Sequence, residues 1–234
     1  MTLSFSLNGK GYVGGGITSG SCAQDLYEYT PESNTWKKMA NPPALIDLCY
    51  GSALAYRGQG YVLSEAEGSK TLVFDAVTNS WSTRASWNKG RLVKKGVSFV
   101  LGDKLYYGLG TAQIPWSGQG DFINNNIYSY SYGSDAWIYE NGGVPSQEQS
   151  VYRNAFIFGR EAYIAFGDAG QLYAFSPIDK YWRKVVSQKL GVASDCSTFM
   201  IGSRGFVVFG HMRSADPGSR KLWVIELNTN PIVR

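Results

Sequence analysis

The segment Tyr29–Trp36, YTPESNTW, places an aromatic residue seven positions before a tryptophan, with a polar turn between the two. The arrangement returns as FDAVTNSW at 74–81, YSYGSDAW at 130–137 and FSPIDKYW at 175–182. From each tryptophan to the next member of a second aromatic column there are 24 to 26 residues. The members of that column are Tyr12, Tyr61, Tyr106, Tyr163 and Phe206. Two columns with such constant spacing indicate an internal repeat of about 45 residues.

Each repeat unit reads as four short strands. In the second unit these are GSALAY at 51–56, YVLSE at 61–65, TLVFDA at 71–76 and WSTRAS at 81–86. The first strand is almost entirely apolar or small, which is typical of a buried central strand. The last strand is more polar, which suits an outer edge. The 28 glycines and the aromatic content of 15% also favour many short strands joined by tight turns.

A period near 45 residues with four strands per unit is typical of a β-propeller, and the chain resembles the kelch-repeat family. The resemblance is carried by the glycines of YVGGG (Gly14–Gly16) and by the recurrent aromatic–tryptophan pair. Only the first unit has the full glycine pair. The WD type of propeller fits less well, because the chain has one histidine and no repeated Gly-His and Trp-Asp pairs. The repeated aromatics are accordingly expected to be core residues.

The resemblance implies an all-β, five-bladed kelch-like propeller built from four-stranded antiparallel blades. We expect one domain over residues 1–234, with blades at about 1–43, 44–88, 89–145, 146–188 and 189–234. The fifth unit is predicted to lack its outer strand, because Arg234 stands where the next tryptophan would fall. The ring could close with a three-stranded blade, receive a strand from a partner chain or domain, or belong to a longer propeller. A ring of five units is favoured.

Composition and charge limit the other classes of function. The chain has 22 basic and 18 acidic residues, and an excess of four positive charges is weak evidence for nucleic-acid binding. No segment approaches the roughly 20 apolar residues of a transmembrane helix, so membrane insertion is not expected. No signal peptide is visible at the start of the sequence, MTLSFSLNGK. Localisation stays open, and a surface, extracellular or virion setting is compatible with the sequence.

Three cysteines, Cys22, Cys49 and Cys196, form neither a disulfide framework nor a zinc pattern. Cys49 and Cys196 stand at the starts of apolar strands, so buried thiols are expected there. Cys22 lies in a Gly/Ser-rich loop. A single disulfide stays open as an alternative.

Binding is expected on one face of the propeller. Strands alternate in direction, so the turns between first and second and between third and fourth strands share one face. The connections between second and third strands and between blades share the other face. Units one, three and five carry insertions in the second-to-third connection, and long loops on a rigid scaffold commonly carry binding sites.

The third insertion, TAQIPWSGQGDFINNN at 111–126, holds two large aromatics in a polar setting that suits a sugar ring or a peptide. The connection SWNKGRLVKK at 86–95 and the fifth insertion add basic residues that would suit an acidic peptide or an anionic sugar. The predicted ligand-binding residues are Trp116, Gln119, Asp121, Phe122, Arg91, His211, Arg213 and Arg220. The alternatives are that the aromatics fold back over the ring and that the charges are only solubilising.

No catalytic residue, metal site or cofactor is predicted. With one histidine, the chain cannot supply the two histidine ligands of kelch-type copper oxidases such as galactose oxidase. The run GYVGGG ends a strand and no helix follows, so it is not a phosphate-binding loop. The favoured function is a non-catalytic binding or scaffold module for a protein or glycan. The alternatives are a carbohydrate-active enzyme of the kelch sialic-acid epimerase type, with Glu65, Glu161 and Asp168 as available acids, or a structural subunit of a surface or viral assembly.

Overall fold

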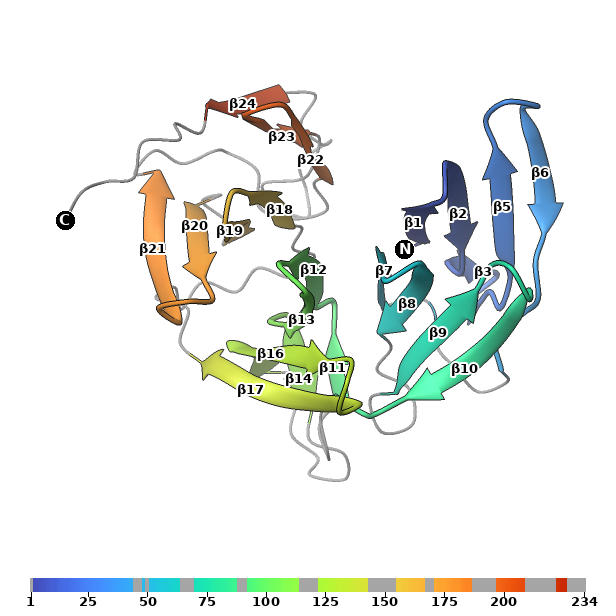
Figure 1. Cartoon of the computed structure of the whole chain (residues 1–234), viewed down its shortest axis with the longest axis horizontal. Helices are drawn as coiled ribbons and strands as arrows, with labels where there is room; N and C mark the ends of the chain where they lie inside the picture. The colour runs from blue at the N-terminus through green and yellow to red at the C-terminus, as the bar shows by residue number, and fades with distance from the viewer. Residues whose placement is uncertain are drawn as a thin grey trace.

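The computed structural model describes residues 2–43, 48, 51–63, 70–87, 92–113, 122–142, 155–166, 171–186, 197–208 and 222–226. Every regular element within these residues is a β-strand. Five main sheets lie around a common axis like the blades of a propeller (Figure 1). The predicted all-β, five-bladed fold is thereby confirmed. None of the described residues belongs to a helix that could span a membrane.

Each main sheet is antiparallel and is formed by strands that follow one another along the chain, with the first strand nearest the axis. The first blade contains β1 (Leu3–Leu7), β2 (Lys10–Gly14), β5 (Leu26–Thr30) and β6 (Thr35–Lys38). The second contains β7 (Ser52–Tyr56), β8 (Gln59–Leu63), β9 (Thr71–Asp75) and β10 (Ser80–Arg84). The third contains β12 (Val97–Leu101), β13 (Lys104–Gly108), β16 (Asn126–Ser131) and β17 (Ala136–Gly142). The fourth contains β18 (Ala155–Phe158), β19 (Glu161–Phe166), β20 (Gln171–Ser176) and β21 (Tyr181–Val186).

The fifth blade has three described strands, β22 (Ser197–Ile201), β23 (Arg204–Val208) and β24 (Leu222–Glu226). This matches the prediction of a last blade without its outer strand among the described residues. Contacts between innermost strands run in series from β1 to β7, β12, β18 and β22. Among the described strands no extensive contact leads from β22 back to β1, and Figure 1 shows the first and last blades on either side of an opening. The closed ring of five units expected from the sequence is therefore not seen in this part of the chain.

Tight turns with left-handed residues define the ends of each blade. Asn8–Gly9 and Arg57–Gly58 have positive φ at both positions, the type I′ geometry that matches the twist of two-residue hairpins. In the turns before the outer strands, the residue two positions before the tryptophan has a φ of 46° to 51°. Those residues are Asn34, Asn79, Asp135 and Lys180. Asn and Asp tolerate this conformation well, so the repeated turn in the sequence encodes a repeated backbone geometry.

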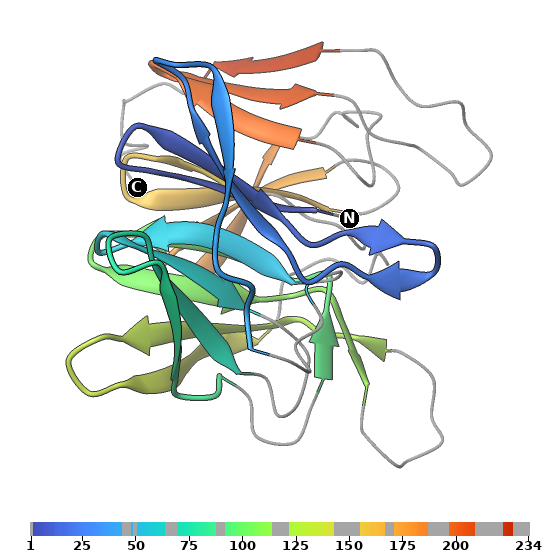
Figure 2. The same ribbon diagram turned by 90° about the vertical axis from the view of Figure 1, so that its right-hand side faces the viewer.

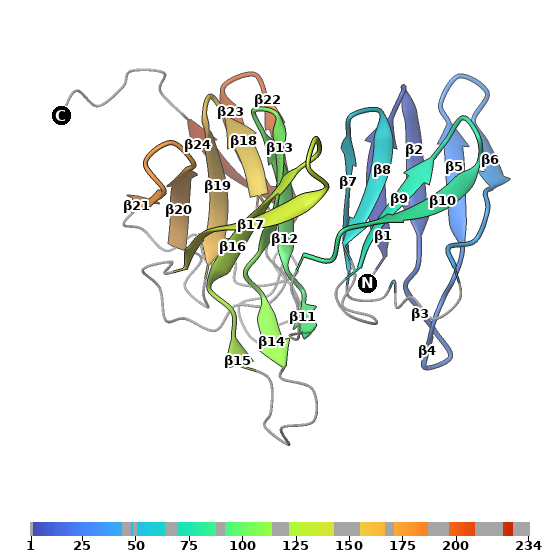
Figure 3. The ribbon, with the colours of Figure 1, turned by 60° about the horizontal axis from the view of Figure 1, so that its bottom comes forward.

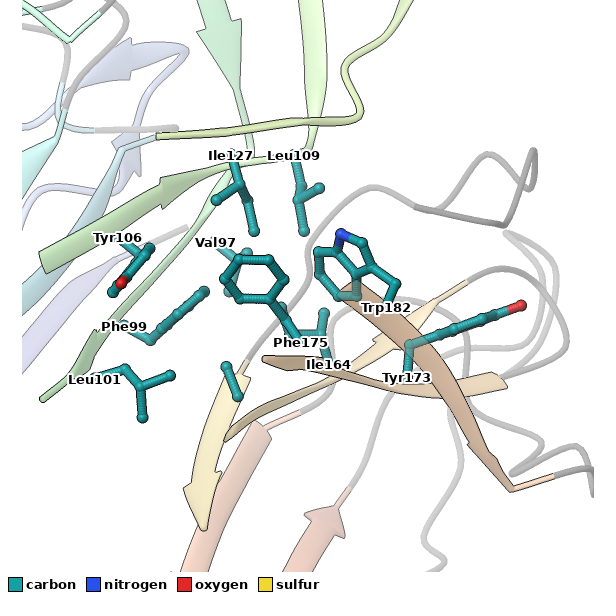
Figure 4. Packing of buried hydrophobic residues seen from close by; sticks show 11 residues of the cluster. Val97, Phe99, Leu101, Tyr106, Leu109, Ile127, Ile164, Tyr173, Phe175 and Trp182 are labelled. Atoms are coloured by element: carbon teal, nitrogen blue, oxygen red, sulfur yellow. The ribbon is translucent and has the colours of Figure 1, made fainter. Parts of the chain in front are cut away.

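The two aromatic columns of the sequence meet between neighbouring blades. The third-strand aromatic and the tryptophan are direct cross-strand partners, with ring centroids 4.9–5.3 Å apart in all four blades that have the pair. The same third-strand ring also contacts the second-strand aromatic of the preceding blade, at 5.8–6.1 Å. Figure 4 shows this arrangement for the third and fourth blades, where Tyr106 and Phe99 face Phe175 and Trp182. The expected core role is confirmed for Trp81, Trp137 and Trp182, which pack between blades. It is wrong for Trp36, which is 58% exposed.

A small residue on the second strand receives a ring from the preceding blade. A Cβ added to Gly60 would clash with the ring of Phe5, and one added to Gly205 would lie 2.6 Å from the ring of Phe156. At the same position of the fourth blade, Ala162 shares a cluster with Phe99. Glycine is therefore needed at these positions because a neighbouring aromatic ring lies directly on the backbone.

The tryptophan and the left-handed turn residue together hold the end of the preceding blade. Asn79 accepts a hydrogen bond from the Ala40 amide at 2.8 Å, while the Trp81 indole donates to the Ala40 carbonyl at 2.8 Å. One blade later, Asp135 accepts from the Ala85 amide at 3.1 Å and Trp137 donates to the Ala85 carbonyl at 3.1 Å. We call this paired contact the interblade clasp. It satisfies both polar groups of one residue where a strand leaves its sheet.

Candidate functional site

Two small accessory sheets project from one end of the propeller, which we call the loop face. The hairpin β3 (Ile17–Thr18) and β4 (Ser21–Cys22) forms one of them. The other contains β11 (Leu92–Lys94), β14 (Thr111–Gln113) and β15 (Phe122–Ile123), in the order β11-β14-β15. Figures 2 and 3 show both sheets extending from the same end, opposite the two-residue hairpin turns. The prediction that these insertions share one face agrees with this arrangement.

The insertions of the first and third blades begin with the same backbone geometry. In the first blade, Gly15 donates to the Asp25 carbonyl at 3.1 Å and Ala23 donates to the Gly16 carbonyl at 2.8 Å. In the third blade, Leu109 donates to the Asn126 carbonyl at 2.8 Å and Asn124 donates to the Gly110 carbonyl at 3.0 Å. The second strand therefore continues beyond its blade as a hairpin, and the two hairpins differ mainly in length.

A pair of left-handed residues sets the direction of each hairpin. Gly15 and Gly16 have φ of 66° and 98°, and Leu109 and Gly110 have φ of 61° and 79°. A Cβ on Gly15 would lie 2.8 Å from the Cβ of Leu48, so glycine is required there for space as well as for conformation. Leu109 adopts the left-handed region although it is a branched, fully buried residue. The two adjacent glycines therefore form the bend that sets the direction of the β3–β4 hairpin.

The long connection between the second and third blades contributes directly to the accessory sheet. Strand β11 pairs with β14, with Leu92 opposite Gln113 and Lys94 opposite Thr111. Strand β14 pairs in turn with β15, with Ala112 opposite Phe122. The two segments that the sequence placed on one face as separate loops are therefore hydrogen-bonded into one sheet.

Buried polar contacts fix the base of this sheet. The side chain of Asn124 is 3% exposed, donates to the Leu109 carbonyl at 3.0 Å and accepts from the Asn126 amide at 3.3 Å. The Asn126 side chain donates to the Tyr128 hydroxyl at 3.4 Å. Asn125 has a buried side-chain oxygen without a hydrogen-bond partner in the described structure. The run INNN at 123–126 therefore supports the base of the hairpin. This structural role was not predicted from the sequence.

The aromatic core continues beneath the accessory sheet. Ala112 of β14 is fully buried in the cluster that includes Trp87 and Tyr107. Trp87 is 2% exposed, and its ring meets Tyr107 edge-on at 4.7 Å. A Cβ on Gly96 would lie 2.7 Å from the Tyr107 ring, so this glycine allows the ring to fit. The accessory sheet is therefore anchored on packed side chains of the second and third blades.

Most residues predicted to bind ligand lie outside the described residues. Trp116, Gln119 and Asp121 belong to residues 114–121, which connect β14 to β15 in the sequence. Phe122 is the first residue of β15, and its backbone partner is Ala112. The remaining predicted residues outside the described ranges are Arg91, His211, Arg213 and Arg220. Of the predicted set, the structure thus places only the backbone of Phe122 on the loop face.

Cys22 of β4 is disulfide-bonded, so the alternative of a single disulfide is the correct one. The other two cysteines, Cys49 and Cys196, both lie outside the described residues. The Cys22 disulfide links the β3–β4 hairpin to another part of the chain. The Gly/Ser-rich sequence around Cys22 did not predict this link.

The described charged clusters are structural ion pairs. Glu161 accepts from Nε and Nη2 of Arg183, at 3.1 and 2.5 Å, and from the Tyr163 hydroxyl at 2.9 Å. The Arg183 hydrogen bonds lower the pKa of Glu161 against the opposing effect of burial. Glu161, one of the three acids considered for catalysis, is therefore ionised and fully engaged. No group of three or more potential metal ligands occurs among the residues that the structure describes.

Comparison with known proteins agrees with the fold and the repeats. No family model matches the chain. The solved structure entitled Structure of YjhT superposes with a TM-score of 0.68 at 17% identity, over 89% of this chain and 72% of that chain. A putative F-box/kelch-repeat protein of Arabidopsis thaliana is 28% identical over 178 residues, which are 74% of this chain and 46% of that protein. The chain thus spans less than half the length of this relative.

The fold, the stacked four-stranded sheets and the structural match define a β-propeller. The repeated aromatic–tryptophan pair and the left-handed glycine pair resemble those of kelch repeats, in agreement with the similarity to the kelch-repeat relative.

Proposed function

We propose that the chain binds a protein or glycan ligand through its loop face. The residues that would contact ligand are Trp116, Gln119 and Asp121, which lie between β14 and β15 in the sequence, Phe122 of β15, and Arg91, which precedes β11. His211, Arg213 and Arg220 would add contacts from the segment between β23 and β24. Aromatic rings would provide the apolar contact, and amide and charged groups would select for polar partners.

One observation carries this proposal: the β14–β15 hairpin is a projecting element on a rigid base. Its origin is fixed by the Leu109–Gly110 bend, by the buried Asn124 and by pairing with β11. A fixed base of this kind reduces the conformational entropy that a binding surface loses when ligand binds. The opposite end of the propeller carries mainly short turns, such as Arg57–Gly58.

The experiment is an array of peptides and glycans probed with two forms of the chain. In the test form, residues 114–121 are replaced by Asn-Gly, a two-residue turn that can close β14 onto β15. The control form carries Val77→Ser on the opposite end, where the side chain is 90% exposed. We expect the hairpin exchange to remove at least nine tenths of the signal from any array ligand, and the control to retain it.

Two results would contradict the proposal. Equal binding by the hairpin-exchanged form would place the ligand elsewhere. Loss of binding by the Val77→Ser form alone would assign it to the opposite end. The kind of array ligand that binds, peptide or glycan, decides between the two ligand classes.

The described residues provide no support for the alternative of a carbohydrate-active enzyme. Glu161 is engaged by Arg183 and Tyr163, while Glu65 and Asp168 lie outside the described ranges. A turnover assay on anomeric or epimeric sugars would separate a carbohydrate-active enzyme from a binding module.

A further inference from the structure

Two arginines and a tyrosine meet between the second and third blades. Arg57 lies in the short turn between β7 and β8, Arg84 ends β10, and Tyr132 lies in the turn between β16 and β17. The guanidinium carbons of Arg57 and Arg84 are 4.9 and 5.5 Å from the centroid of the Tyr132 ring. Arg57 also lies over the ring of Tyr56 at 5.6 Å and donates to its hydroxyl at 3.1 Å. We call Arg57, Arg84 and Tyr132 the arginine–tyrosine site.

The residues of this site do not belong to the repeated pattern. Tyr132 stands two positions after the third-strand aromatic, where the other three blades with an aromatic–tryptophan pair have proline or alanine. Arg84 stands three positions after the tryptophan, where the first blade has Met39, a buried residue of an apolar cluster. Arg57 stands where the first blade has Asn8. Packing of the repeats therefore does not require two arginines and a tyrosine at this interface.

Neither arginine forms an ion pair within the described part of the chain, although Asp103 and Asp135 lie nearby. The Asp135 carboxylate accepts from the Tyr130 hydroxyl at 2.6 Å and from the Ala85 amide at 3.1 Å. Asp103 accepts from the Tyr56 hydroxyl at 2.6 Å through its backbone carbonyl. A guanidinium group stacked on an aromatic ring keeps N–H groups at its edge that can donate to an oxyanion.

Two buried donors beside the stacked rings lack an acceptor. Tyr61 is fully buried against Tyr56, and its hydroxyl has no hydrogen-bond partner in the described structure. The buried Nε of Arg84 also has none there. Burial raises the pKa of Tyr61 to about 12, against the effect of the Arg84 charge, so the hydroxyl keeps its proton. A buried donor without an acceptor costs free energy, and both donors here would be satisfied by an added oxygen atom.

The first blade shows which kind of acceptor is missing. Tyr12 occupies the position of Tyr61, and its hydroxyl donates to the carboxylate of Glu28 at 2.6 Å. Glu28 is the cross-strand partner of Tyr12, whereas the cross-strand partner of Tyr61 is Val73. Valine has no side-chain acceptor. The second blade therefore lacks the anionic oxygen that satisfies the same tyrosine in the first blade.

We propose that the arginine–tyrosine site binds an oxyanion, such as the phosphate or carboxylate group of a ligand. The guanidinium groups of Arg57 and Arg84 would donate to its outer oxygens, since arginine binds such groups through two N–H donors at once. The Tyr61 hydroxyl and the Arg84 Nε would donate to the innermost oxygen. Arg57 is exposed and Tyr132 is 39% exposed, so the site opens to solvent on their side. This site is separate from the loop face and does not depend on the function proposed there.

The experiment titrates the 234-residue chain with sodium phosphate and follows the NMR signals of the amides of residues 132–135. Sodium chloride at the same ionic strength controls for screening of charge. We expect saturable shifts with phosphate and not with chloride. Arg84→Met and Arg57→Asn introduce the residues of the first blade, and each should weaken phosphate binding at least about tenfold. Arg160→Asn is the matched control, because it removes an exposed arginine from the β18–β19 turn, and it should retain the affinity.

Tyr61→Phe separates binding from a structural role. It removes a buried hydroxyl without a partner, so Tm should stay the same or rise while phosphate affinity falls. The form with residues 114–121 replaced by Asn-Gly should bind phosphate like the wild type, which distinguishes this site from the loop face.

Sodium acetate separates the two sources of the oxyanion. Shifts with phosphate alone would assign a phosphate group, and equal shifts with acetate would assign a carboxylate; both support the site. Two outcomes would overturn the proposal. One is the lack of any saturable shift with phosphate or acetate beyond that with chloride. The other is equal affinity in the wild type and in a folded Arg84→Met or Arg57→Asn variant.

Discussion

At the scale of single residues, the spacing of aromatics and tryptophans carries the fold because each pair performs two tasks. The pair stacks within its blade, and it also contacts the preceding blade through ring packing and the clasp. The sequence predicted these residues as core. It did not reveal the partners of the clasp, because Ala40 and Ala85 contribute only backbone atoms and so have no side-chain signature.

Gly60 and Gly11 form a matched pair for testing the ring-on-glycine contact. Gly60→Ala should lower stability by about 1–3 kcal/mol, because the new methyl group would clash with the Phe5 ring and force a shift between blades. Gly11→Ala should be neutral or stabilising by up to about 1 kcal/mol, because nothing closer than 3.8 Å meets its Cβ. Urea unfolding of both variants measures the difference. Equal losses would show that Gly60 is not covered by Phe5.

Asp135 offers a pH test of the clasp. The Tyr130 hydroxyl, which donates at 2.6 Å, and the Ala85 amide hold the pKa of Asp135 below its usual value. Because this pKa is lowered in the folded state, its contribution is present above about pH 4 and is lost as the pH falls further. Asp135→Ala should cost about 1–2 kcal/mol at pH 7 through two lost hydrogen bonds.

Asp135→Asn is the control for this prediction. Asparagine tolerates the left-handed turn and still accepts both hydrogen bonds, as Asn79 does for the Ala40 amide. Its stability at pH 7 should therefore lie close to that of the wild type, and its loss of stability below pH 4 should be smaller. Thermal melts from pH 3 to 7 provide the readout. Identical pH profiles for the wild type and Asp135→Asn would exclude a role for this carboxylate.

At the scale of elements, strands could be predicted far better than the accessory sheet. The four strands of each blade follow from alternation and turn residues, and β7, β9 and β10 begin within one residue of the predicted strands. The segments 86–95 and 111–126 were predicted as loops, yet they pair as β11, β14 and β15. Their pairing depends on two segments that lie far apart in the chain, and short polar strands give no periodic pattern of their own.

Asn124 should determine the rigidity of that sheet. Asn124→Ala removes a buried donor and acceptor and leaves the Leu109 carbonyl without its side-chain partner. We expect a loss of about 1–3 kcal/mol and faster exchange in β14 and β15 than in β12 and β13. Hydrogen exchange resolves the two sets of strands. A uniform change over both sets would mean that Asn124 supports the blade rather than the hairpin.

At the scale of the whole molecule, the order of blades was predictable but the closure of the ring was not. The number of repeats predicts five units. Closure of the ring depends on the angle between blades and on whether residues such as Phe199 and Trp36 are covered, and the spacing of residues in the sequence does not predict either. The division into five blades within one domain stays a prediction, as do the contacts of the ligand-binding residues. The face on which the third insertion lies could be predicted, because strand direction alternates within every blade.

The most direct test of the binding account is the affinity of Trp116→Ala for a ligand identified on the array, measured together with Tm. Truncating a central aromatic in a binding surface commonly costs 2 kcal/mol or more, which is roughly a thirtyfold loss of affinity. We expect this loss with Tm changed by less than about two degrees. A drop in Tm of many degrees with affinity retained would show that Trp116 covers the core of the propeller, and the assignment of the loop face would fail.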